Sequence, residues 1–237
     1  MHRAYHRWYS RSLGRDMELL VFGHAGPPLV VFPSSMGSFH EYEDTGMTGA
    51  VADKLEYGHL QLYCVTSVDT ESWYNRHVHP RVRVARHLQY EDYILRDVVP
   101  LVGHLNPGRA IGVTGCSFGG LHAMLIALRH PWTFLSCITM SGAFDVSQFL
   151  DGYYDDTCYF LNPVHFLPNL HDSRWLGQFR RNKWVLATGE HDICRGANEH
   201  FSGILHGRGI PHSLHVWGDG SKHDWPCWRP MAAAYLP

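Results

Sequence analysis

Ser117 stands at the centre of a short segment whose residue types and spacing suit nucleophilic chemistry. The segment Gly115-Cys116-Ser117-Phe118-Gly119 matches the pattern G-x-S-x-G, in which the serine lies on a sharp turn between a strand and a helix. Glycines two positions to either side leave room for that turn because they have no side chain. A helix that begins directly after the serine favours developing negative charge. The motif predicts a serine nucleophile for acyl transfer, and a glycine-rich turn with a capping serine is the alternative interpretation.

A serine nucleophile needs a histidine that takes its proton. The chain has 19 histidines. His223 is the candidate because it follows the last predicted strand by a few residues, in a loop that leads to Trp225 and Trp228. These tryptophans could shield the imidazole from water. An exposed loop histidine is the alternative interpretation.

The third residue of such a site is a carboxylate that fixes the imidazole tautomer. Asp192 follows the strand expected over Lys183–Thr188, which gives the order serine, aspartate, histidine that is typical of one hydrolase class. Glu190 lies nearer to the strand, and Glu199 lies on the helix expected next. We predict Asp192 as the acid, with Glu199 as the second candidate.

A tetrahedral intermediate at Ser117 also needs two backbone amides that bind its oxyanion. The amide of Phe118, the residue after the nucleophile, is the first candidate. The second is expected from the loop Pro33–Gly37 after an apolar strand. Ser35 or Met36 would supply it, and the sequence alone does not choose between these neighbours.

Alternating strands and helices are expected to position these residues. Short apolar runs predict strands at Pro28–Phe32, Gln61–Val65, Ala110–Thr114, Phe134–Met140, Lys183–Thr188 and His212–Trp217. Helical patterns lie at Met47–Tyr57, Arg81–Val102, Gly119–His130, Ala197–His206 and Trp228–Tyr235. Arg3–Leu13 and Met17–Phe22 read as an opening antiparallel hairpin. This alternation predicts an α/β fold with a mostly parallel central sheet and helices on both faces.

Length and composition favour one globular domain over residues 1–237, of which 45% are hydrophobic and 18% charged. Residues 146–178 interrupt the alternation and are expected to form an insertion over the edge of the sheet that carries Ser117. The formal net charge of −2 argues against a nucleic-acid partner. No apolar run reaches membrane-spanning length and the first 15 residues lack a signal-peptide pattern, so we expect a cytoplasmic protein without membrane contact.

Several segments together resemble the putative-esterase branch of the α/β hydrolases, which includes S-formylglutathione hydrolases, feruloyl esterases and mycolyltransferases. The resemblance spans nearly the whole chain. The segments that carry it are Phe32-Pro33-Ser34-Ser35, Glu43-Asp44, Ser72-Trp73-Tyr74-Asn75, Gly115 to Gly120, Ser141-Gly142, and Trp217-Gly218 leading to His223-Asp224-Trp225. It implies the α/β-hydrolase fold and an esterase without cofactor or metal, whose Ser117 forms an acyl-enzyme that water hydrolyses. It leaves the acid open. Some relatives resemble this chain in having an aspartate where Asp192 stands, whereas mycolyltransferases use a glutamate on the following helix, close to where Glu199 would fall.

The sequence thus predicts a carboxylic ester hydrolase with Ser117, His223 and Asp192 as its catalytic residues and a small-molecule ester as its substrate. An acyltransferase would use the same acyl-enzyme. The third hypothesis is a catalytically inactive binding protein of the same fold, since a fold does not dictate a function. Exposed aromatic residues in the segment 146–178 could form a homodimer contact. The identity of the ester depends on how that segment folds.

Overall fold

A single eight-stranded sheet runs through the computed structural model of residues 1–237, in the order β1-β2-β4-β3-β5-β6-β7-β8. The strands are β1 Arg3–Ser10, β2 Arg15–Phe22, β3 Pro28–Phe32, β4 Gln61–Val65, β5 Ile111–Cys116, β6 Phe134–Met140, β7 Lys183–Gly189 and β8 Ser213–Trp217. β1 and β2 form the predicted antiparallel hairpin, and β2 pairs antiparallel with β4. From β4 to β8 all neighbours are parallel. The predicted mostly parallel sheet is confirmed.

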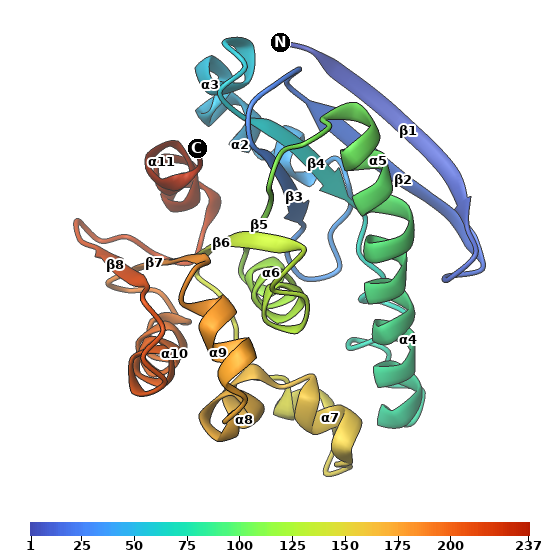
Figure 1. The fold of residues 1–237 in the computed structure, drawn as a ribbon, viewed down its shortest axis with the longest axis vertical. Helices are drawn as coiled ribbons and strands as arrows, with labels where there is room; N and C mark the ends of the chain where they lie inside the picture. The colour runs from blue at the N-terminus through green and yellow to red at the C-terminus, as the bar shows by residue number, and fades with distance from the viewer.

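Helices cover both faces of the sheet because successive side chains of each strand point to opposite sides. In β3, Val30 and Phe32 enter the larger core, whereas Leu29 and Val31 enter the smaller one. The longer helices of the larger core are α4 Pro80–Tyr93, α5 Val99–Leu105, α6 Phe118–Arg129 and α10 Arg195–Gly207. Those of the smaller core are α1 Glu41–Asp44, α2 Met47–Ala50, α3 Ala52–Glu56 and α11 Trp225–Tyr235 (Figure 1).

Two predicted helices are interrupted. The helix expected over Arg81–Val102 changes to a π-helical segment at Ile94–Val98 before α5 begins. Pro100, near the start of α5, has no amide hydrogen for the carbonyl one turn earlier, which accounts for the widened turn. The helix expected over Met47–Tyr57 is divided at Val51, whose φ of −119° lies outside the helical range.

The segment 146–178 forms five short helical pieces. They are η2 Ser147–Phe149, α7 Asp156–Phe160, α8 Pro163–Phe166, η3 Leu167–Asn169 and α9 Ser173–Phe179. The first piece lies beside Ser117's neighbour, since the rings of Phe149 and Phe118 are 5.2 Å apart. The later helices lie near the other end of α6 (Figure 1).

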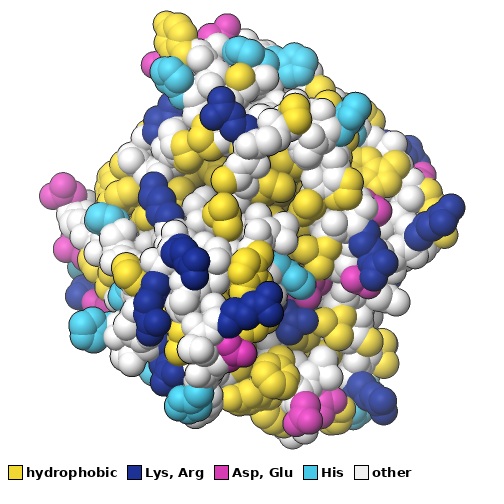
Figure 2. Space-filling model, viewed as in Figure 1, with side chains coloured by type: hydrophobic (Ala, Val, Ile, Leu, Met, Phe, Trp, Pro, Cys, Tyr) yellow, Lys and Arg dark blue, Asp and Glu magenta, His cyan; other side chains and the backbone are white.

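On the face seen in Figure 2, hydrophobic side chains lie exposed between Lys, Arg and His side chains. Large exposed hydrophobic residues include Trp132, Leu135 and Phe160, and Arg174 lies over the Trp132 ring at 5.0 Å. None of the helices combines the length and the apolar character that a membrane crossing requires.

Candidate active site

Ser117 occupies a sharp turn between β5 and α6, as the motif predicts. Its backbone angles, φ of 55° and ψ of −121°, lie in a region that residues other than glycine rarely adopt. The flanking glycines are required by close backbone contacts. A Cβ on Gly115 would lie 2.4 Å from the backbone of Gly119, and a Cβ on Gly119 would lie 2.4 Å from the carbonyl oxygen of Phe32. The turn therefore holds Ser117 at the carboxyl end of β5 in a conformation that these glycines permit.

Ser117, His223 and Asp192 lie in one hydrogen-bonded chain. His223 Nε2 is 2.9 Å from Ser117 Oγ, and His223 Nδ1 is 2.8 Å from Asp192 Oδ1. The serine lies in the turn after β5, the aspartate in the loop after β7, and the histidine in the loop after β8. The three residues meet because the parallel strands end at the same edge of the sheet.

The two other candidate acids lie elsewhere. Glu199, on α10, accepts a hydrogen bond from Arg195 Nε at 2.8 Å. Glu190 accepts a hydrogen bond from the Gly220 amide at 2.5 Å and so holds the loop that precedes His223. Asp192 is the carboxylate that contacts His223, and Glu199 makes no hydrogen bond to His223.

Besides His223, two further donors hold the Asp192 carboxylate. Its Oδ2 accepts a hydrogen bond from Ser141 Oγ, and its Oδ1 accepts one from the Cys194 amide at 2.7 Å. Ser141 Oγ in turn accepts a hydrogen bond from Trp228 Nε1 at 2.7 Å. Burial acts to raise the pKa of Asp192, but the hydrogen bonds from His223, Ser141 and Cys194 outweigh it and lower the pKa. The aspartate therefore stays ionised.

His223 is a stronger base than a free imidazole. Burial lowers its pKa, but the hydrogen bond to Asp192 and the nearby Cys194 thiol raise the pKa to about 9. The edge-on ring of Trp228 lies 4.9 Å from the imidazole, so one of the two predicted tryptophans packs against it. Trp225 packs against Trp228 at 4.7 Å. Only 18% of the His223 side chain is exposed.

The loop after β3 presents one unpaired amide between two that carboxylates bind. The Ser34 amide donates to Glu41 Oε1 at 2.7 Å, and the Met36 amide donates to Asp69 Oδ2 at 3.0 Å. The Ser35 amide makes no hydrogen bond within the protein. The contacts therefore favour Ser35 over Met36 as the donor that is free for a ligand.

Phe118 offers the second free amide. It is the first residue of α6, where no earlier turn supplies an acceptor. Tyr74 bridges the two donors, because its hydroxyl donates to Ser35 Oγ at 2.7 Å and its ring packs edge-on against Phe118 at 5.3 Å. The two unpaired amides belong to segments in backbone contact, since a Cβ on Gly119 would lie 2.5 Å from the carbonyl oxygen of Pro33.

One group of three possible metal ligands occurs in the structure. Asp192, Cys194 and His223 place their ligand atoms within 4.8 Å of one another. The carboxylate and the imidazole of this group are already hydrogen-bonded to each other, so we interpret the group as part of the Ser117–His223–Asp192 chain.

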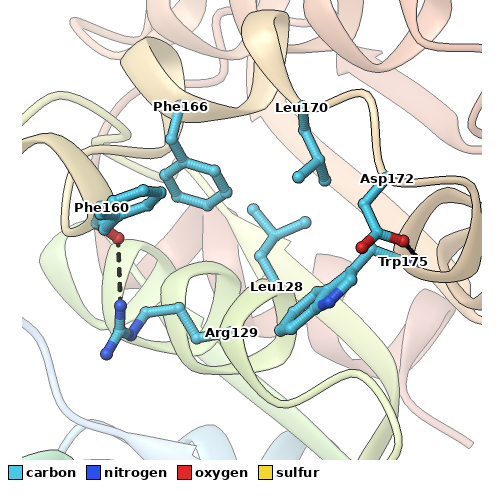
Figure 3. Close-up of a pocket in the computed structure, with 7 residues that line it drawn as sticks. All are labelled: Leu128, Arg129, Phe160, Phe166, Leu170, Asp172 and Trp175. Carbon is cyan, nitrogen blue, oxygen red and sulfur yellow. Dashed lines mark hydrogen bonds between the residues drawn. The ribbon is translucent and has the colours of Figure 1, made fainter.

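A separate apolar cavity of about 420 Å³ lies at the opposite end of α6. Its lining residues converge from α6 and from the segment that follows β6 (Figure 3): Leu128, Arg129, Phe160, Phe166, Leu170, Asp172 and Trp175. At ~1.5 Å per residue, the 12 residues of α6 put this cavity roughly 17 Å from Ser117. Of the aromatic residues in 146–178, Phe160 and Phe166 therefore line a space remote from the nucleophile.

A family model ties this arrangement to known enzymes. The model described as "Putative esterase" matches residues 10–236. The chain belongs to this esterase family. The resemblance found in the sequence is thereby confirmed, and the protein is an esterase. The comparison with curated protein sequences found no match.

Solved structures show the same fold over the whole of this esterase. A ferulic acid esterase superposes with a TM-score of 0.79 at 15% identity, covering 100% of this chain and 96% of its own. An S-formylglutathione hydrolase from Staphylococcus aureus gives 0.73 at 19% identity, covering 98% and 94%. A fluorophosphonate-binding serine hydrolase from the same organism gives 0.74 at 16% identity, covering 98% and 96%. These likenesses confirm the α/β-hydrolase fold.

Four residues of the site carried no predicted role. Ser141 and Tyr74 belong to segments that mark the family resemblance, and Ser141 directly follows β6 at the edge that carries Ser117. That position was the available signal for Ser141. Glu41 and Asp69 bind the loop after β3 from elsewhere in the chain, and no local pattern indicates which amide each would accept.

Proposed function

We propose that this esterase hydrolyses small carboxylic esters through a covalent acyl-enzyme, with Ser117 as the nucleophile, His223 as the base and Asp192 as the acid. The proposal rests above all on the hydrogen bonds of 2.9 and 2.8 Å that link these three side chains. A serine hydroxyl is a weak nucleophile until a base accepts its proton. The linked histidine supplies that base.

Acylation begins when Ser117 Oγ attacks the ester carbonyl carbon and His223 Nε2 accepts the hydroxyl proton. The carbonyl oxygen becomes negative and accepts hydrogen bonds from the Ser35 and Phe118 amides. Asp192 stabilises the imidazolium through Nδ1–H without taking its proton. His223 then gives the proton to the leaving alkoxide, the carbon–oxygen bond breaks, and the alcohol departs.

Deacylation repeats these steps with water. His223 Nε2 accepts a proton from water while the water oxygen attacks the acyl carbon of Ser117. The same two amides bind the second oxyanion. The bond to Ser117 Oγ breaks as the serine regains its proton from the imidazolium, and the carboxylic acid leaves.

Substitution of the nucleophile tests this proposal. In the Ser117→Ala variant, hydrolysis of a chromogenic short-chain ester should fall by about 10⁵ to 10⁶-fold in kcat, and labelling by a fluorophosphonate probe should disappear. The matched control is Ser202→Ala, a serine on α10 that hydrogen-bonds to His212. Parental activity in Ser117→Ala would refute the proposal.

An added alcohol tests the acyl-enzyme itself. If an acyl-enzyme forms, methanol should divert part of the product from the carboxylic acid to the methyl ester, in the same proportion for esters that share an acyl group but differ in leaving group. A proportion that changes with the leaving group would contradict a common intermediate. Preferential capture of acyl groups by an alcohol or amine over water would instead identify an acyltransferase.

A further inference from the structure

A second aspartate–histidine pair lies buried behind the active site and takes no part in the chain that links Ser117 to Asp192. His122 Nε2 on α6 is 2.9 Å from Asp69 Oδ1 in the loop after β4. The side chains are 2% and 0% exposed. Burial of such a pair is costly unless every polar atom finds a partner, so its presence calls for a structural or functional reason.

Packing fixes the ring of His122 on several sides. It stacks on Phe32 and on His87, with ring centres 5.9 and 5.4 Å away, and meets Phe118 edge-on at 5.0 Å. Burial, followed by the effect of His122, lowers the pKa of His87 to about 3, so His87 is a neutral neighbour. The imidazole that holds Asp69 is therefore packed directly against the residue after the nucleophile.

The other oxygen of Asp69 reaches the oxyanion loop. It accepts the hydrogen bond from the Met36 amide at 3.0 Å, next to the free amide of Ser35. Met36 has a φ of 58°, a left-handed conformation that costs energy for a residue with a side chain. The loop thus needs an outside contact to keep this shape, and Asp69 supplies one.

We propose that Asp69, held by His122, is a positioning residue that fixes the loop after β3 so that the Ser35 amide points at the substrate's carbonyl oxygen. This inference rests on the proposed function and assigns a role to a pair that touches neither substrate nor His223. Met36 is bound to Asp69 and Ser35 is left free, so the same contact selects the donor. A displacement of about 1 Å at such a site lowers the rate about 100-fold.

His122 also moderates the charge of Asp69. A carboxylate close to a developing oxyanion opposes it, because like charges repel. The Nε2–H of His122 donates to Oδ1, the oxygen that does not bind Met36, and draws negative charge towards α6 and away from the loop. Asp69 therefore favours the oxyanion through the geometry of the loop, and His122 reduces the electrostatic cost of a carboxylate at that place.

Paired substitutions at Asp69 test the inference. Asp69→Ala removes the acceptor for the Met36 amide, and we expect kcat to fall on the order of 10- to 100-fold while KM changes less than about threefold, because the interaction strengthens only in the transition state. Asp69→Asn keeps a carbonyl oxygen for that amide, so it should recover most of the lost kcat. The midpoint of the pH profile should stay at the parental value in both, since His223 and Asp192 are untouched.

Glu91 on α4 offers a matched control, because its partners are at the C-terminal end of α6. It is a buried carboxylate that binds Arg129 and His130, and Glu91→Ala should lower the melting temperature with kcat within about twofold of the parent. His122→Phe, which keeps the ring but loses the donor, is the second variant if Asp69→Ala does not fold; its kcat should fall about tenfold.

Three results would overturn the inference. They are parental kcat in Asp69→Ala or, where that variant does not fold, in His122→Phe; equal losses in Asp69→Ala and Asp69→Asn; and a shift of the pH midpoint. The Ser117→Ala variant, measured in the same assay, separates these failures from failure of the proposed function. An active Ser117→Ala contradicts the function itself, whereas an inactive one beside an unaffected Asp69→Ala contradicts only the positioning role.

Discussion

Two aspartate–histidine pairs of the molecule have a fully buried aspartate, and their distances are similar, 2.8 Å for Asp192–His223 and 2.9 Å for Asp69–His122. A third pair, His40–Asp44, lies on the surface. The first two differ in what lies beyond each pair. His223 turns its second nitrogen to the Ser117 hydroxyl and keeps 18% of its side chain exposed. His122 is sealed inside the core, and the pair ends instead on the backbone amide of Met36. The same two residue types can thus move a proton or hold a loop, depending on whether a nucleophile or an amide stands at the end of the pair.

The largest expected difference between the pairs is in their histidines. His223→Ala should lower kcat by about 10⁵ to 10⁶-fold, because no base then activates Ser117. His122→Phe should lower kcat only about tenfold. Steady-state kinetics on one chromogenic ester measures both. Losses of equal size would erase the distinction between a catalytic and a positioning pair.

The aspartate of the pair that reaches Ser117 is expected to act on its histidine. Asp192→Asn should lower kcat about 10⁴-fold, because the amide no longer fixes the tautomer or stabilises the imidazolium. It should also lower the pKa of His223, since the hydrogen bond to Asp192 is the largest of the contributions, together with those of Cys194, that raise that pKa against burial. Titration of the imidazole by NMR measures the pKa. An unchanged pKa in Asp192→Asn would show that another group sets it.

The buried pair should matter more for stability. Asp69→Ala leaves His122 buried without its partner, and we expect the free energy of unfolding to fall by about 1–3 kcal/mol. Ser117→Ala, which removes a hydroxyl from a strained turn, should change it by less than about 1 kcal/mol. Urea unfolding curves provide the comparison. A loss below about 1 kcal/mol for Asp69→Ala would mean that the pair is poorly coupled to the fold.

The pH dependence should separate activity from stability. His223 acts as a base only when neutral, so kcat/KM should rise with pH to a midpoint near 9. The same raised pKa stabilises the fold fully below about pH 6.5, the ordinary value for histidine, and this stabilisation is lost as pH rises through about 9. Activity should therefore increase over the range in which melting temperature decreases. A kinetic midpoint near 6.5 would contradict the strong contact with Asp192.

The last expected effect concerns the hydrogen bond that Ser141 donates to Asp192. Ser141→Ala removes a donor to Asp192 and an acceptor for Trp228, and should lower kcat about tenfold, on the scale of one charge-assisted hydrogen bond. Ser202→Ala again serves as the control. If kcat in Ser141→Ala equals that of the parent, the hydrogen bonds from His223 and Cys194 suffice to hold Asp192.

Local patterns predicted the parts of the molecule that depend on neighbours in sequence. Short motifs and apolar runs predict the turn at Ser117, most of the strands, and the order of serine, aspartate and histidine along the chain. The residues alone left the acid open, because Asp192 and Glu199 both lie beyond β7 and only the loop's path decides which reaches His223. Pro100 was visible in the sequence, yet whether a proline ends a helix or widens one turn depends on packing.

Long-range contacts set the limit of sequence reasoning at the oxyanion loop. Ser35 and Met36 are neighbours, and nothing in the local sequence favours the amide of one over that of the other as the oxyanion donor. The distinction comes from Asp69, 33 positions after Met36, and from His122 a further 53 positions along. No spacing rule connects a carboxylate to an amide across one crossover of a sheet and to an imidazole across the next. The pair became visible only when the fold brought it behind the loop.

The contact between Gly119 and the carbonyl oxygens of Phe32 and Pro33 has a consequence for how this site can evolve. A Cβ at position 119 would lie 2.4 Å from one carbonyl oxygen and 2.5 Å from the other. These carbonyls and Gly119 belong to the two segments that carry the Ser35 and Phe118 amides. Even a methyl group would push the two segments apart and widen the gap in which both amides must meet one oxygen atom. We therefore expect any substitution of Gly119 to disturb the site, whereas Asp69 can be replaced by a residue that keeps an acceptor for the Met36 amide.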